Sequence, residues 1–173
     1  MQPRRLLSTG TIVAVVLGLI LGVLNTRKAE AQFNIAGIYI VARSPDVGPS
    51  RILKINSDGT LTSIQSTQLG RGAADTTFSN QMGVWTPINP QTIHATVFDF
   101  VYDVEAFFGT TIASYTLEFS EDFQMVTGVV EGRVFAPGVN PLEPSSEAPV
   151  LTFTDNFVAQ RANANSAQPT PSQ

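Results

Sequence analysis

Histidine and cysteine, two residue types that commonly transfer protons or bind metal ions, are almost absent from this sequence. The chain has 173 residues, one histidine, His94, and no cysteine. A metal site built from two or more histidines is therefore impossible within one chain. His94 lies within a β-rich segment, where its ring either serves a structural role through a hydrogen bond or acts as a general acid or base.

Asp99 is the carboxylate with the most unusual position. It shares one face of a predicted strand with four apolar residues: Ile93, Ala95, Val97 and Val101. An acid in such a row either faces solvent or is buried with a raised pKa that suits proton transfer. Asp99, Asp103 and Glu105 lie close enough in the sequence for a calcium site, but their spacing matches no calcium-binding loop. We therefore expect neither a metal ion nor another cofactor.

Two further charged groups lie on the strands that follow. Glu118 and Arg133 belong to consecutive predicted strands joined by a short turn, so we expect Glu118 to form a cross-strand pair with Arg133 or with one of its neighbours. If this face turns inward, Arg133 would instead anchor a ligand. Glu118 joins Asp99 and His94 as the third candidate for a catalytic group.

Aromatic rings indicate where a ligand would lie. Several of them combine a large apolar ring with one hydrogen-bonding group, which suits either a pocket wall or the closure of a barrel end. The expected wall consists of Trp85, Phe98, Phe100, Tyr102 and Tyr115. The sequence contains no Gly-x-Ser-x-Gly turn, phosphate-binding glycine loop or His-Glu-x-x-His motif, so it does not indicate a conventional hydrolase.

The elements that position these groups are predicted to be strands. After Gln32 no helical period extends beyond a turn or two, and Asp58-Gly59 predicts a tight hairpin. The expected strands are residues 33–43, 51–57, 60–67, 78–86, 92–103, 109–120, 122–135 and 150–160. Eight sequential strands with short links predict an all-β fold, either an eight-stranded antiparallel β-barrel or a two-layer sandwich. We favour the barrel because closure removes edge strands.

Two of these strands are apolar on both faces. Residues 92–103 show no plainly polar face, and residues 122–135 alternate valine with Gly128 and Gly132. The glycines would let the strand bend and let bulky neighbours cross it. Because a soluble antiparallel sheet normally leaves one face polar, we expect the outside of these strands to be covered, and a homo-oligomer is one way to cover it.

The two ends of the chain differ from its middle. Residues 1–31 have the basic start, the apolar stretch and the Ala29-Glu30-Ala31 pattern of a signal peptide cleaved after Ala31, which predicts a secreted or periplasmic protein. We expect a barrel domain at 32–160 and a disordered tail at 161–173. Cleavage would leave 6 basic and 13 acidic residues, a net charge of −7. Such a charge argues against nucleic acid or a membrane surface as a partner.

Short motifs link the chain to known barrels. Gly83-Val84-Trp85 resembles the Gly-x-Trp of lipocalins and the wider calycin group, a resemblance that implies a barrel holding small apolar ligands. Val126-Thr127-Gly128 is similar to a segment of allene oxide cyclases and dirigent proteins, barrels that guide reactive intermediates. The wider pattern over residues 35–160, including Thr92-Ile93-His94-Ala95-Thr96, resembles uncharacterised exported bacterial β-barrel proteins and implies a location and a fold.

Three functions remain open from the sequence. The first is a non-enzymatic barrel that binds a small apolar or amphipathic molecule inside. The second is a cyclase- or isomerase-like enzyme in which Asp99, Glu118 or His94 moves a proton. The third is a structural or surface-interaction protein with a solid core. An open cavity of roughly 300 Å³ would favour the first two, and a buried carboxylate within it would favour the enzyme.

Overall fold

The structure is a computed structural model that describes residues 35–43, 48–69, 76–103, 106–143 and 147–163. The expected signal peptide, residues 1–31, and most of the expected tail lie outside these ranges. Within them, no helix is long and apolar enough to cross a membrane.

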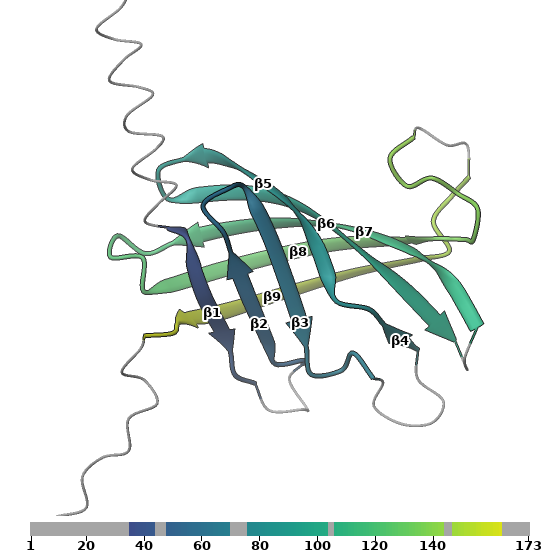
Figure 1. The fold of residues 1–173 in the computed structure, drawn as a ribbon, viewed down its shortest axis with the longest axis horizontal. Helices are drawn as coiled ribbons and strands as arrows, with labels where there is room; N and C mark the ends of the chain where they lie inside the picture. The colour runs from purple at the N-terminus through teal and green to yellow at the C-terminus, as the bar shows by residue number, and fades with distance from the viewer. Residues whose placement is uncertain (1–34, 44–47, 70–75, 104–105, 144–146, 164–173) are drawn as a thin grey trace, which may run out of the picture.

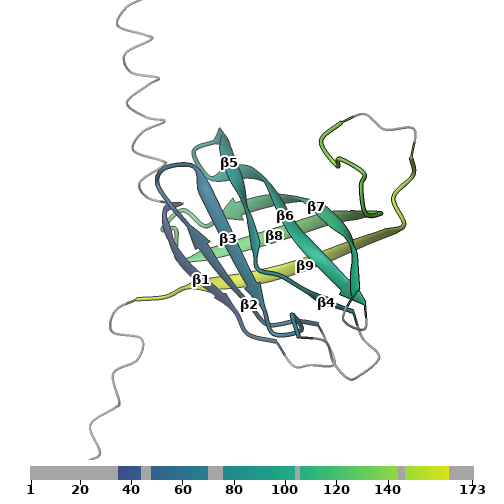
Figure 2. The same cartoon turned by 45° about the vertical axis from the view of Figure 1, so that its right-hand side comes forward.

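The described residues form nine strands, eight of which close an antiparallel barrel (Figures 1 and 2). They are β1 (Gly37–Val41), β2 (Arg51–Ile55), β3 (Thr60–Gln65), β4 (Thr77–Phe78), β5 (Gln81–Asn89), β6 (Thr92–Asp103), β7 (Ala106–Phe119), β8 (Met125–Phe135) and β9 (Leu151–Arg161). The barrel runs β1-β2-β3-β5-β6-β7-β8-β9 and closes where β9 pairs with β1. The short β4 is the additional strand and pairs with the end of β6. The all-β barrel predicted from the sequence is confirmed.

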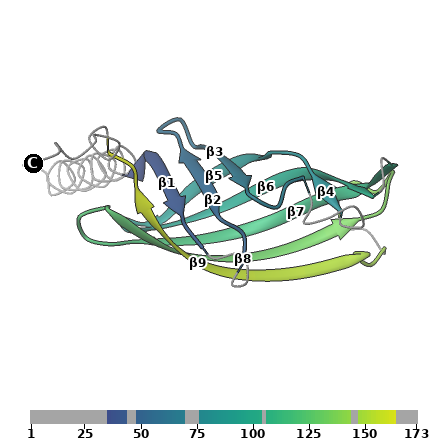
Figure 3. The ribbon, with the colours of Figure 1, turned by 90° about the horizontal axis from the view of Figure 1, so that it is seen from below.

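The barrel wall is uneven. Strands β6 to β9 are long and pair along most of their length, whereas β1 to β3 are short (Figure 3). The pairing that closes the barrel involves only two residue pairs, Tyr39 with Arg161 and Ile40 with Gln160. We call this short pairing the β1–β9 seam. Beyond it, the first half of β9 has no ladder partner on the β1 side among the described residues.

Strand ends differ from the predicted ones for local reasons. The Asp58-Gly59 hairpin is confirmed: Gly59 adopts a φ of 88°, and the Asp58 carboxylate accepts a hydrogen bond from the Thr60 backbone at 2.9 Å. The sequence predicts that Pro87 ends a strand, but β5 continues to Asn89 through a register shift, since a bulge accommodates a residue without an N–H. At the other end of the chain, β9 runs to Arg161, one residue beyond the predicted domain.

Apolar side chains fill one end of the barrel. Trp85, Leu117 and Phe119 are buried there, and the Tyr39 hydroxyl donates to the Ile35 carbonyl at 2.9 Å. Farther along, the rings of Phe157 and Phe153 lie over Gly128 and Gly132 of the neighbouring strand β8, where a Cβ atom would meet the ring. The glycines therefore make room for bulky neighbours, as the sequence predicted. We call the half of the barrel that holds Trp85, Leu117 and Phe119 the closed end, and the opposite half the open end.

Candidate functional site

Polar side chains replace apolar ones where the interior approaches the open end. The alternation along each strand still turns these positions inward, but the residue types change. The buried polar residues of the described chain all lie in this layer: Arg51, Ser63, Gln81, Asp99 and Thr111. Ser63 faces Gln81 across β3 and β5, and Asp99 faces Thr111 across β6 and β7. The register thus assembles one polar layer from five strands.

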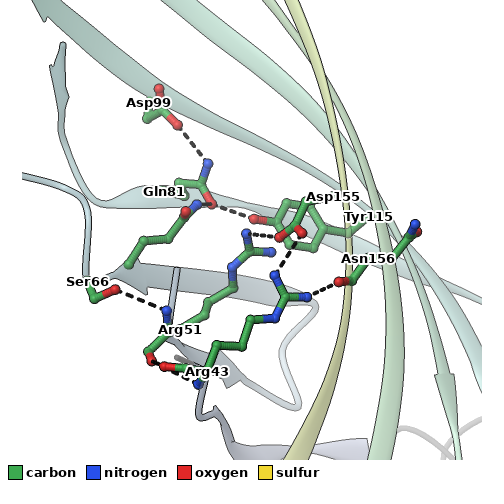
Figure 4. A network of polar contacts seen from close by, with 10 residues as sticks. Arg43, Arg51, Ser66, Gln81, Asp99, Tyr115, Asp155 and Asn156 are labelled. Carbon is green, nitrogen blue, oxygen red and sulfur yellow. Dashed lines mark hydrogen bonds and ion pairs between the residues drawn. The ribbon is translucent and has the colours of Figure 1, made fainter. Parts of the chain in front are cut away.

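A chain of hydrogen bonds runs through this layer to Asp99 (Figure 4). The Tyr115 hydroxyl donates to Gln81 Oε1 at 2.5 Å, and Gln65 Nε2 donates to the same oxygen at 3.2 Å. Gln81 Nε2 in turn donates to Asp99 Oδ2 at 2.8 Å. The oxygen and the nitrogen of the Gln81 amide both form hydrogen bonds, so the orientation of the amide is fixed. The amide nitrogen therefore contacts Oδ2 of Asp99 and not Oδ1.

Two arginines share one carboxylate beside this chain. Arg51 Nη2 and Arg43 Nη1 each lie 2.9 Å from a different oxygen of Asp155, and Arg43 also donates to the Asn156 carbonyl. The Arg51 guanidinium lies over the Phe157 ring, 4.7 Å from its centroid, and the residue is only 4% exposed. These contacts connect β9 to β2 and to the chain beyond β1, next to the short β1–β9 seam. We call Arg43, Arg51 and Asp155 the seam clamp.

Four buried polar atoms among the described residues have no hydrogen-bond partner within 3.5 Å in favourable geometry: Arg51 Nε, Arg51 Nη1, Ser63 Oγ and Asp99 Oδ1. Two of them have a hydroxyl partner at less favourable geometry, since Ser63 lowers the pKa of Tyr115 and Thr111 lowers that of Asp99. All four belong to the polar layer. Buried polar atoms in native proteins are nearly always satisfied by protein, water or a ligand. The polar layer is therefore the part of the described interior in which a water molecule or a polar ligand would find further hydrogen-bonding groups.

A half-open hollow of about 250 Å³ lies at the open end. Its lining is mainly apolar around a polar base: Gln65, Thr76, Phe78, Gln81, Asp99, Val101, Thr111, Val134, Leu151 and Phe153. Asp99 is the one ionisable side chain among the described residues in this lining. A wider groove of about 410 Å³ lies outside, against exposed isoleucines of β1 to β3, and it is more open than the hollow. The hollow is the better candidate site because it combines enclosure with convergent polar groups.

Burial changes the acid–base behaviour of two groups at the base of the hollow. Asp99 is 6% exposed, and desolvation raises the pKa of its carboxyl above the ordinary 3.8, an effect that the Thr111 hydroxyl and the Gln81 amide partly oppose. Desolvation also raises the pKa of the Tyr115 phenol, with the Arg51 cation opposing it. Tyr115 is therefore a hydrogen-bond donor at neutral pH, and Asp99 holds its proton to a higher pH than a free aspartate.

Replacement of Asp99 by asparagine should alter how stability depends on pH. Because the pKa of Asp99 is higher in the folded state, its contribution to stability is present below pH 3.8 and is lost as pH rises through the folded pKa. An asparagine side chain stays neutral throughout, so the D99N variant should gain stability relative to wild type over that window. Urea unfolding at a series of pH values measures the difference. A difference that stays constant with pH would contradict the raised pKa.

The structure separates the aromatic residues that were expected to line one pocket. Tyr115 is buried and its hydroxyl joins the polar layer, whereas Trp85 is buried at the closed end and donates to the Asn56 carbonyl at 3.0 Å. Phe98, Phe100 and Tyr102 occupy the outer face of β6, because the row of β6 residues that includes Asp99 takes the inward face. Their expected place in the pocket wall is therefore corrected.

The remaining predicted charged residues also lie outside. His94, Glu118 and Arg133 are exposed on outward positions of β6, β7 and β8. Glu118 pairs in register with Thr127, and Arg133 pairs with Ile112, so the expected ion pair between Glu118 and Arg133 does not form. Arg133 instead lies over the Phe135 ring, 5.8 Å from its centroid. The hollow therefore receives Asp99 and none of these three.

The calcium site considered from the sequence is not assembled by the described residues. Asp99 faces the interior, whereas Asp103 is exposed beyond a register shift in β6. Glu105 lies outside the described residues. Within the described part of the chain, no three histidine, aspartate or glutamate side chains gather closely enough to hold a metal ion.

Gln81 and the seam clamp were missed by sequence reasoning. A signal was available for two of these residues: Arg51 alternates with Leu53 and Ile55, and Asp155 alternates with Phe153 and Phe157. Each interrupts an inward apolar row as Asp99 does. No family model matches the chain, and no curated protein or solved structure matches it. The closed barrel is compatible with a lipocalin-like fold, and the site geometry is the basis for inferring a function.

Proposed function

We propose that this protein binds a small amphipathic molecule in the hollow at the open end of the barrel. One observation carries the proposal: a buried carboxyl with an unpartnered oxygen, Asp99 Oδ1, lies in an otherwise largely apolar enclosure. The apolar part of the ligand would lie against Phe78, Val101 and Phe153. Its polar group would satisfy Asp99, which is the usual division of labour in small-molecule sites.

The shape of the interior limits the size of this ligand. The closed end is packed with apolar side chains, so a ligand enters only as far as the polar layer. The hollow of about 250 Å³ lies slightly below the range typical of pockets for drug-sized molecules. The ligand is therefore small. The solid-core alternative describes the closed end of the barrel rather than the whole interior.

A bulky residue at the rim of the hollow should block this binding. Leu151 lines the hollow and is 50% exposed, whereas its neighbour Val150 is 52% exposed and does not line it. We expect L151W to weaken binding of the uncharged dye N-phenyl-1-naphthylamine by about tenfold or more, because the indole competes for the same space. The matched variant V150W should bind as wild type does. Fluorescence titration measures both.

Native mass spectrometry supplies an independent readout of the same prediction. Protein purified from its source should retain a small molecule in wild type and V150W and lose it in L151W. Equal dye affinity in the two tryptophan variants would place the dye elsewhere, and a lack of binding to wild type would contradict the proposal.

A second candidate function follows from the same carboxyl. Asp99 is desolvated and faces the hollow, the combination that favours a cyclase- or isomerase-like enzyme in which it donates or accepts a proton. His94 and Glu118, the other catalytic candidates, lie on the outer face and do not reach this hollow. In an enzyme, D99N would abolish turnover while leaving binding in place.

Export and self-association stay predictions. The outer face of β6 and β7 carries exposed rings, with Phe100 51% exposed and 5.8 Å from the Phe107 ring centroid to centroid. The Tyr102 ring also contacts Phe107, with a centroid distance of 6.2 Å. This apolar surface supports the expectation that copies of the chain associate through their outer faces. Removal of residues 1–31 on export would leave the described barrel intact.

A further inference from the structure

The two oxygens of Asp99 have different surroundings. Oδ2 accepts the hydrogen bond from Gln81 Nε2, and the Tyr115 hydroxyl and Gln65 Nε2 hold the Gln81 amide in that orientation from behind. Oδ1 is buried and has no hydrogen-bond partner within 3.5 Å in favourable geometry among the described residues. The Thr111 hydroxyl of β7 faces the same carboxyl and lies close enough to lower its pKa. Figure 4 shows Oδ1 pointing away from Gln81. When the carboxyl is neutral, its proton therefore belongs on Oδ1, because Oδ2 is already an acceptor.

A neutral Asp99 offers the hollow one O–H donor. We propose that the hollow selects small apolar molecules that carry an uncharged oxygen acceptor, such as a ketone carbonyl, through one hydrogen bond donated by Asp99 Oδ1. This inference rests on the proposed function and names the ligand class for it. The apolar walls of Val101, Val134 and Phe153 accommodate the hydrocarbon part of such a molecule.

The charges around Asp99 favour a neutral ligand. Arg51 from β2 and Arg43 beyond β1 are bound to Asp155 of β9, and none of these three lines the hollow. From β7, Thr111 and the Tyr115 phenol face Asp99, and from β5 the neutral Gln81 does so. An anionic ligand would meet no cation in the described lining. A cationic ligand would require a carboxylate that burial disfavours.

Camphor and its parent hydrocarbon camphane are suitable probes, because they share a compact skeleton and differ in one carbonyl. We expect full-length wild type below the pKa of Asp99 to bind camphor about tenfold more tightly than camphane, since a buried donor is left unpaired by the hydrocarbon. Binding of camphor should weaken as pH rises and Asp99 loses its proton. Calorimetry at several pH values, with camphane as competitor, measures both effects.

Two variants of Asp99 separate the effect of its hydrogen-bond donor from the effect of its charge. In D99N the side-chain oxygen accepts from Gln81 and the NH2 group faces the hollow, so camphor should bind with wild-type affinity and without pH dependence. In D99L the donor is lost, and camphor should bind about tenfold more weakly, as camphane does. The infrared carbonyl stretch of bound camphor should fall in wild type and D99N and stay unshifted in D99L, because hydrogen bonding weakens the C=O bond.

The outcomes distinguish this inference from the proposed function. If camphor and camphane bind equally well, or camphor binds D99L as it binds wild type, the hollow takes ligands but Asp99 does not select them, and the inference is wrong. Tighter binding of camphor at high pH would also show that the inference is wrong. If neither compound binds and L151W makes no difference to any ligand, the proposed function fails as well.

Discussion

Replacing Asp155 by asparagine is expected to destabilise the barrel by about 3 kcal/mol, because it leaves a buried arginine without its counter-charge. Arg51 is almost completely buried, and Asp155 is the anionic group that contacts it. Two other polar atoms of Arg51 already lack partners. Asparagine keeps the shape of the side chain but removes the charge shared by Arg51 and Arg43.

The seam clamp also substitutes for backbone pairing. Beyond the β1–β9 seam, the first half of β9 is connected to β2 by Arg51 and to the chain beyond β1 by Arg43, rather than by a ladder. Loss of Asp155 should therefore loosen this part of the barrel wall as well as unpair a charge. Hydrogen exchange of the β9 amides should rise in D155N before exchange at the closed end does.

Two comparisons make the D155N test specific. Asp103 is exposed at the end of β6, so the same change there, D103N, should alter the free energy of unfolding by no more than about 0.5 kcal/mol. In the background R51M, D155N should cost less, since the almost completely buried guanidinium is absent and only the more exposed Arg43 loses its counter-charge. Urea unfolding of the four variants measures these differences. If D155N lost no more stability than D103N, this result would contradict the role of the seam clamp.

Replacing Gly128 by valine is expected to cost about 3 kcal/mol through overpacking. Gly128 pairs with Phe157 across β8 and β9, and a Cβ atom at this position would lie 2.2 Å from the Phe157 ring. That ring is buried between Gly128 and the Arg51 guanidinium, with Tyr115 at its edge. Because neighbours occupy these sides of the ring, it has little space into which it can move.

Phe157 and Gly128 should behave as one packing unit. The variant F157A should lose about 3 kcal/mol by leaving a cavity. In the double variant the valine side chain occupies part of that cavity, so the combined loss should be smaller than the sum by about 1 kcal/mol or more. Val129 faces outward, and V129A serves as the control with a small effect. Additive losses in the double variant would show that the ring and the glycine are independent.

Local patterns were sufficient to predict most of the barrel. The alternation of Ile93, Ala95, Val97 and Val101 marks one face of β6, and the Asp58-Gly59 turn marks a hairpin, because both signals depend on neighbouring residues only. The glycines of β8 also indicated the bulky side chains that cross them. The strand end predicted at Pro87 was wrong, since the bulge that tolerates this proline depends on the pairing with β6.

The site was harder to predict because it depends on which face of each strand turns inward. Both faces of β6 are apolar, so sequence alone did not show that Phe98, Phe100 and Tyr102 lie outside while Asp99 lies inside. The partners of Asp99 come from distant segments and meet only through register, as Gln81 does through β5. Sequence patterns directed attention to Asp99 and Tyr115, which both face the interior, but they carried no signal for the hydrogen bonds that join them through Gln81.

The β1–β9 seam brings the first and last strands of the barrel side by side. With β4 set aside, all other neighbouring strands in the wall are also consecutive in the described chain. The same cyclic order of strands therefore results wherever the chain begins, provided that a linker joins the present ends at the β1–β9 seam. A circularly permuted chain that begins at the Asp58-Gly59 turn would keep β1 paired with both β2 and β9. It would make the β1–β9 pairing local and move the non-local closure to the pairing of β2 with β3.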